Sequence, residues 1–135
     1  MNWLVAEDET DIRMLIAAMC QVWGHSTLLF ESGQKAWDWL DELETGKHTG
    51  EIPDLVLMDI RMPGKKGNEV AQRMRTLASF NRVPIILMTA FSLTEAERKA
   101  MMQDDGVDLI IHKPLPDFED LRIMLHNIHT RRQTA

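Results

Sequence analysis

A continuous apolar run at residues 55–58, Leu-Val-Leu-Met, ends at Asp59 and is soon followed by Met62, Pro63 and Gly64. A short apolar run without polar alternation is typical of a strand that is buried on both faces, as in a parallel sheet. Proline and glycine then turn the chain away, so Asp59 stands where the buried strand emerges. In open α/β sheets, ligands bind outside the carboxyl ends of the strands. We therefore expect Asp59 to be the chemical centre of the protein.

The rest of the chain alternates apolar runs with segments of helical periodicity. The predicted strands cover residues 4–6, 26–30, 55–58, 84–88 and 109–111. The predicted helices cover residues 10–23, 32–43, 68–79, 94–104 and 117–128, with Thr10, Ser32, Thr94 and Asp117 as N-terminal caps. This alternation predicts right-handed βαβ units and a parallel sheet with helices on both faces. Residues 44–51 are predicted to form a polar loop, and the tail 130–135 is expected to fray.

Composition limits the classes of protein to consider. The length of 135 residues fits one domain, and 44% hydrophobic residues are enough for a core. A net charge of −6 argues against non-specific binding to nucleic acid or to anionic membranes. No apolar run approaches the roughly 18 residues of a transmembrane helix, and the single Cys20 cannot form an internal disulfide. These features favour a soluble cytoplasmic domain in a reducing compartment.

Polar side chains follow four of the five predicted strands: Glu7 and Asp8, then Asp59, Thr89 and Lys113. We expect these groups to meet, because the carboxyl ends of parallel strands share one edge of the sheet. Three carboxylates repel one another, and a hard divalent cation such as Mg²⁺ would relieve that repulsion. An aspartate is a competent nucleophile toward a phosphoryl group. The metal and Lys113 would stabilise the transferred charge, and the Thr89 hydroxyl can donate to a further phosphoryl oxygen.

Together these motifs resemble the receiver domains of two-component response regulators. The matching residues are Glu7-Asp8, Asp59 with Met62-Pro63 and Gly67, Thr89-Ala90, and Lys113-Pro114. The resemblance covers residues 3 to about 129, and it implies a flavodoxin-like sheet with strand order 2-1-3-4-5. We therefore expect a receiver domain over residues 1–129, followed by the tail.

The resemblance also implies a role for each matching residue. Asp59 would be the phosphoacceptor, charged by a sensor histidine kinase or a phosphotransfer protein, and Thr89 and Lys113 would contact the phosphate. The implied Mg²⁺ ligands are Glu7, Asp8, Asp59 and the backbone carbonyl of Arg61. The peptide bond before Pro114 is expected to be cis. Such a domain catalyses only its own phosphorylation and dephosphorylation, so we expect a signalling module rather than an enzyme.

One position departs from the family pattern, and it bears on how the domain would signal. Receivers usually carry Tyr or Phe three residues before the lysine of the fifth strand, whereas this chain has Ile110. We still expect phosphorylation to shift the conformation for partner binding through the face of the fourth helix, fifth strand and fifth helix. The same face is the candidate surface for a homodimer, and we expect no nucleic-acid or membrane partner.

Several alternative functions compete with that of a stand-alone receiver. The chain could instead be one domain of a larger regulator or hybrid kinase. An aspartyl-phosphate phosphatase of the haloacid dehalogenase type would need a second Asp at position 61, where Arg61 stands. A nucleotide-binding flavodoxin-like domain would need a Gly-rich loop where Glu7-Asp8-Glu9 would repel phosphate. A receiver that never binds phosphate disagrees with the complete set of acidic residues, Thr89 and Lys113.

Overall fold

The computed structural model describes residues 1–46 and 51–134. Its elements are β1 (Asn2–Ala6), α1 (Thr10–Val22), β2 (Ser26–Phe30), α2 (Gly33–Glu44), β3 (Leu55–Asp59), α3 (Gly67–Met74), the 3₁₀ helix η1 (Ala78–Phe80), β4 (Ile85–Thr89), α4 (Glu95–Gln103), β5 (Leu109–His112) and α5 (Phe118–Thr134). All the strand pairs are parallel, in the order β2-β1-β3-β4-β5, which confirms the predicted flavodoxin-like fold. Residues 47–50 of the predicted polar loop, and Ala135 of the predicted tail, lie outside the described residues.

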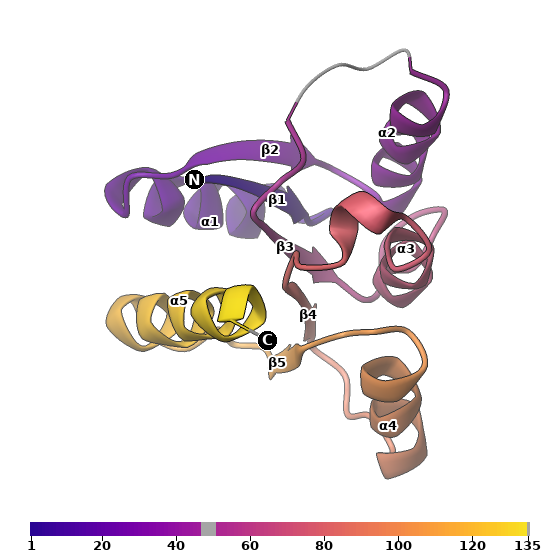
Figure 1. Ribbon diagram of the computed structural model, residues 1–135. Helices are drawn as coiled ribbons and strands as arrows, with labels where there is room; N and C mark the ends of the chain where they lie inside the picture. Colours follow the sequence, from indigo (N-terminus) through magenta and orange to yellow (C-terminus); the bar gives the residue numbers. More distant parts are fainter. Residues whose placement is uncertain (47–50, 135) are drawn as a thin grey trace.

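The sheet lies between two layers of helices (Figure 1), with α1 and α5 on one face and α2, α3 and α4 on the other. Alternate residues of β3 serve the two layers. Leu55 and Leu57 pack with the α1–α5 layer, whereas Val56 and Met58 pack with the α2–α4 layer. Every residue of β3 is therefore buried, which explains why its sequence is continuously apolar.

Three of the four predicted helix caps are confirmed. The hydroxyl of Ser32 accepts a hydrogen bond from the backbone N–H of Lys35. Thr94 forms the predicted capping box with Glu97, and Asp117 accepts from the backbone of the first turn of α5. The prediction for Thr10 was wrong, because Glu9 is the N-cap of α1 and makes no side-chain cap bond.

The third predicted helix, over residues 68–79, is shorter than expected. The α-helix ends at Met74, and a separate 3₁₀ turn follows at residues 78–80. The hydroxyl of Thr76 donates to the carbonyl of Arg73, a local bond that competes with continued helix. Leu77 then has an extended backbone. At the other end of the chain, α5 runs to Thr134, and fraying of residues 130–134 in solution stays a prediction. Within the described residues, no helix is both long and apolar enough to cross a membrane.

The inner face of α2 also differs from the expectation. The spacing of apolar residues in this helix predicts a core face of Ala36, Trp37, Leu40 and Leu43, but Trp39 is buried there and Trp37 is only partly buried. Residues 36, 37, 39 and 40 all lie within about one turn of helix, so the local pattern fits either tryptophan. The rotation of α2 on the sheet decides between them.

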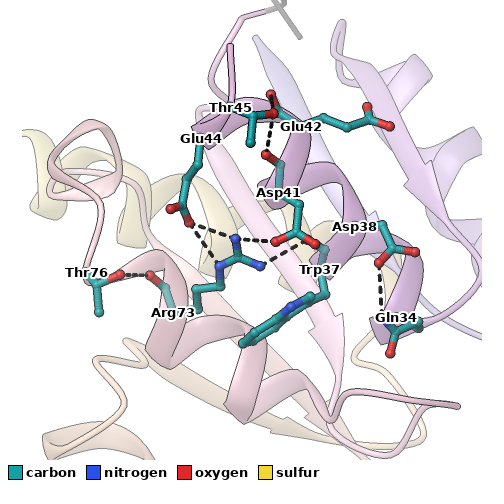
Figure 2. Close-up of polar contacts among 9 residues, drawn as sticks. All are labelled: Gln34, Trp37, Asp38, Asp41, Glu42, Glu44, Thr45, Arg73 and Thr76. Carbon is teal, nitrogen blue, oxygen red and sulfur yellow. Dashed lines mark hydrogen bonds and ion pairs between the residues drawn. The ribbon is translucent and has the colours of Figure 1, made fainter. Parts of the chain in front are cut away.

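Trp37 instead joins α2 to the β3–α3 loop and to α3. The Nζ of Lys65 lies 4.5 Å from the centroid of its ring, and the Cζ of Arg73 lies 4.4 Å from it. Figure 2 shows Arg73 reaching from α3 to Asp41 and Glu44 of α2, with which it forms ion pairs of 2.7 and 2.8 Å. The β3–α3 loop and α3, which follow Asp59, are therefore held against α2 by Lys65 and Arg73.

A pair of histidines that the sequence did not predict connects the turn before β2 to α5. The Nε2 atoms of His25 and His126 are 2.8 Å apart, and Trp3 stacks on the His25 ring at 4.3 Å. Burial lowers the pKa of His25 to about 4 from its ordinary 6.5, helped by the charges of the N-terminal amine, His126 and His129 and opposed by Asp54. The unfolded chain therefore binds more protons between these two pH values.

We expect the stability contributed by His25 to be fully present above about pH 6.5 and to be lost as the pH falls toward about 4. Urea denaturation at about pH 7.5 and about pH 5 measures this loss. His25→Gln should lose less stability than the wild type between these two pH values, whereas His112→Gln, at an exposed position, should behave like the wild type. Equal pH dependence in His25→Gln and the wild type would contradict the expectation.

Candidate functional site

The predicted acidic residues meet at the carboxyl edge of the sheet. Carboxylate oxygens of Glu7, Asp8 and Asp59 lie within 4.8 Å of one another. They meet because β1 and β3 are neighbours, with Ala6 opposite Met58. The next residues, Glu7 and Asp59, therefore lie at the same level along the sheet. Glu7 is fully buried and Asp59 is 6% exposed, whereas Asp8 is exposed to solvent.

Lys113 bridges two of these carboxylates. Its Nζ lies 3.1 and 3.2 Å from the two oxygens of Glu7 and 2.5 Å from Oδ2 of Asp59. The backbone N–H of Lys113 donates to the carbonyl of Thr89 on the neighbouring strand, at 2.8 Å. Its long side chain therefore crosses β4 to reach the acidic residues that follow β1 and β3. The peptide bond between Lys113 and Pro114 is cis, as predicted.

The charges at this site are unbalanced. The pKa of Glu7 is raised from its ordinary 4.5 to about 7, mainly by burial and also by the nearby Asp59, while Lys113 acts in the opposite direction. Burial acts to lower the pKa of Lys113, but its hydrogen bonds with Asp59 and Glu7 and their charges raise it overall. The cluster thus holds three carboxylates and one ammonium group, which contacts two of them. An all-oxygen donor set with surplus negative charge is suited to a hard cation such as Mg²⁺.

Thr89 and Arg61 lie beside this cluster, and both of their side chains contact Phe91. Thr89 is 1% exposed, and its hydroxyl accepts from the backbone N–H of Phe91 at 3.0 Å and donates to the Phe91 carbonyl at 3.2 Å. The backbone N–H of Arg61 donates to Oδ1 of Asp59 at 3.0 Å, and its guanidinium lies over the Phe91 ring. Metal ligation by the Arg61 carbonyl stays a prediction. Sequence reasoning missed Phe91, although an aromatic residue two positions after a strand-end threonine was a visible signal.

Gly67 allows a close approach between α3 and the end of β3. A Cβ atom on this residue would lie 2.3 Å from the carbonyl oxygen of Asp59 and 3.3 Å from the Cα of Ile60. The backbone N–H of Gly67 donates to the Ile60 carbonyl at 2.9 Å. Gly67 therefore lets α3 begin directly against the backbone of Asp59.

Comparison with known proteins gives consistent matches over the whole fold. The family model described as "Response regulator receiver domain" matches residues 3–126. The response regulator Rre1 of Synechocystis is 29% identical over 133 residues, which are 98% of this chain and 53% of that protein. The chain thus spans about half of the length of this relative, and 44% of RppA from the same organism.

Solved structures agree with this match. A receiver domain protein of Methanospirillum hungatei has a TM-score of 0.79 at 20% identity, covering 98% of this chain and 96% of that one. The receiver domain of the sensor histidine kinase PA1611 of Pseudomonas aeruginosa has a TM-score of 0.75 at 26% identity, covering 96% and 97%. The latter structure contains a magnesium ion coordinated in its active site cleft.

Proposed function

This chain belongs to the response regulator receiver domain family of two-component signalling, and from this premise we propose that Asp59 accepts a phosphoryl group in a reaction that requires Mg²⁺. The observation that carries the proposal is the bridge from Lys113 to both Glu7 and Asp59. It brings a nucleophilic carboxylate, a second carboxylate and a fixed cation together at one strand edge. The coordination of magnesium in the PA1611 receiver supports the choice of metal.

In the proposed reaction, an oxygen of Asp59 forms a bond to phosphorus as the bond from phosphorus to the donor breaks. The electron pair of the broken bond leaves with the donor, a histidine of a kinase or phosphotransfer protein. Glu7, Asp8 and Asp59, with the Arg61 carbonyl, would hold Mg²⁺, which supplies charge neutralisation at the phosphoryl oxygens when bound. Lys113 is already placed at Asp59 and would bind a phosphoryl oxygen there.

Thr89 would complete the phosphate contacts and act as the switch. Its hydroxyl would leave the Phe91 backbone and donate to a phosphoryl oxygen.

Receiver domains are signalling domains, and we propose that this one, over residues 1–129, catalyses only its own phosphorylation and dephosphorylation. The face of α4, β5 and α5 is our proposed surface for the downstream partner or a homodimer. Within α4, Met101 alone is buried. The helix therefore has little apolar area to hold it against the sheet.

The proposed reaction is tested by incubating the protein with a small phosphodonor, such as acetyl phosphate, and measuring intact mass. We expect one added phosphoryl group in the presence of Mg²⁺, lost again in acid or on standing. With a chelator in place of the metal, uptake should fall to background, because the surplus of carboxylate charge would then oppose the incoming phosphoryl oxygens. Equal uptake with and without metal would contradict the proposal.

A further inference from the structure

The loops that follow Asp59 and Thr89 are joined by one side-chain contact. Arg61 lies two residues after Asp59, Phe91 lies two residues after Thr89, and the Cζ of Arg61 is 3.9 Å from the centroid of the Phe91 ring. Both side chains also line a cavity of about 280 Å³ that reaches Thr89. The contact therefore joins the loop after the strand that carries Asp59 to the loop after the strand that carries Thr89.

The backbone of Phe91 occupies the Thr89 hydroxyl both as a hydrogen-bond donor and as an acceptor. The N–H of Phe91 donates to that hydroxyl at 3.0 Å, and the hydroxyl donates to the Phe91 carbonyl at 3.2 Å. Thr89 can donate to a phosphoryl oxygen only after the bond to the Phe91 carbonyl breaks, because a hydroxyl has one hydrogen to donate. Any interaction that keeps Phe91 in place therefore opposes the movement of Thr89.

We propose that Arg61 and Phe91 are positioning residues that hold Thr89 in its bond with the Phe91 backbone and so set how readily the site accepts a phosphoryl group. This inference rests on the proposed function and adds two residues to it. Phe91 is 49% exposed. The ring is thus not buried in the core, and Arg61 provides its attachment to the β3–α3 loop.

The contact should be visible as a change in apparent affinity. If the protein binds the phosphoryl mimic only after Thr89 is released, its apparent dissociation constant equals the intrinsic one divided by the fraction of molecules in which Thr89 is already released. Loss of an exposed cation–π contact, worth about 0.5–1 kcal/mol, should therefore tighten binding of a phosphoryl mimic about two- to fivefold. A simple charge effect has the opposite sign, because removing the Arg61 charge would weaken the binding of an anion.

The experiment measures the dissociation constant of beryllofluoride in the presence of Mg²⁺, by calorimetric titration of the full chain. We expect Arg61→Gln and Phe91→Leu each to bind about two- to fivefold more tightly than the wild type. The double variant should bind no more tightly than either single one, since both substitutions remove the same contact. Arg61→Lys keeps a cation over the ring and should return affinity toward the wild-type value.

A matched control is available on the same loop. Lys65 lies over Trp37 in a second cation–π contact, so Lys65→Gln removes an equal charge and an equivalent contact without touching Phe91. Its beryllofluoride affinity should equal that of the wild type or be weaker. Wild-type affinity in Arg61→Gln and Phe91→Leu, or additive effects in the double variant, would overturn the positioning role and leave the proposed function intact. Failure of the wild type to bind would overturn the proposed function, and this inference with it.

Discussion

Replacing Asp59 by asparagine should reduce the uptake of acid-labile phosphate to less than about a hundredth of the wild-type rate. The amide has nearly the shape of the carboxylate but lacks the negative oxygen that attacks phosphorus. Asp59 is also one of the three carboxylates proposed to hold the metal, so the substitution removes the nucleophile and replaces a charged ligand with a neutral amide. The measurement is the time course of phosphorylation by a small phosphodonor, followed by intact mass.

Asp54 provides the matched control, because it directly precedes the same strand and accepts a hydrogen bond from the backbone N–H of Asn2. Asp54→Asn should be phosphorylated at the wild-type rate. Thermal unfolding of both variants separates loss of the nucleophile from loss of the fold. Asp59→Asn should remain folded, since it removes one negative charge from a cluster of three carboxylates and leaves Glu7 as a partner for Lys113. Phosphate uptake by Asp59→Asn at the wild-type rate would refute the assignment.

Adding one methyl group at Gly67 should damage both stability and phosphorylation. Its Cβ would lie 2.3 Å from the carbonyl oxygen and 3.1 Å from the carbonyl carbon of Asp59. These are backbone atoms, so no side chain can rotate away, and α3 or the end of β3 must move. Overpacking of this kind costs about 1–3 kcal/mol or more. A displaced Asp59 should also slow phosphorylation by about tenfold or more, because this chemistry depends on positioning.

Gly46→Ala is the control for a glycine replacement without a clash. Gly46 has a φ of +74°, and a Cβ there would meet nothing within 4 Å. Backbone strain alone should cost about 1–2 kcal/mol at this position and leave the phosphorylation rate unchanged. Urea denaturation and phosphorylation time courses measure both effects. Wild-type stability and rate in Gly67→Ala would contradict the close approach described here.

The elements of the fold could be predicted from the sequence because their signals are local. A continuous apolar run such as residues 55–58 indicates a strand covered on both faces, and β3 is buried at every position. Capping residues such as Ser32 and Thr94 act within one helical turn, so they too are readable from neighbours. Parallel topology then requires the strand ends to share one edge, which is why Glu7, Asp8 and Asp59 could be placed together in advance.

Other features depend on how elements rotate and pack, and the sequence left them undetermined. The apolar pattern of α2 allowed Trp37 or Trp39 to face the core, and packing on the sheet selected Trp39. The extent of the third helix was overestimated because apolar spacing continues past Met74, where local bonds end the α-helix.

The sequence by itself therefore determined the type and order of the strands, the edge at which the reactive groups gather, and Asp59 as their centre. Only the tertiary structure decided which partner each group takes. Lys113 reaches Asp59 across 54 residues of chain, while the Thr89 hydroxyl bonds to Phe91 rather than to the acidic cluster. The physical reason is that periodicity and capping are properties of neighbouring residues. A side-chain contact between strand ends depends on the twist and register of the whole sheet.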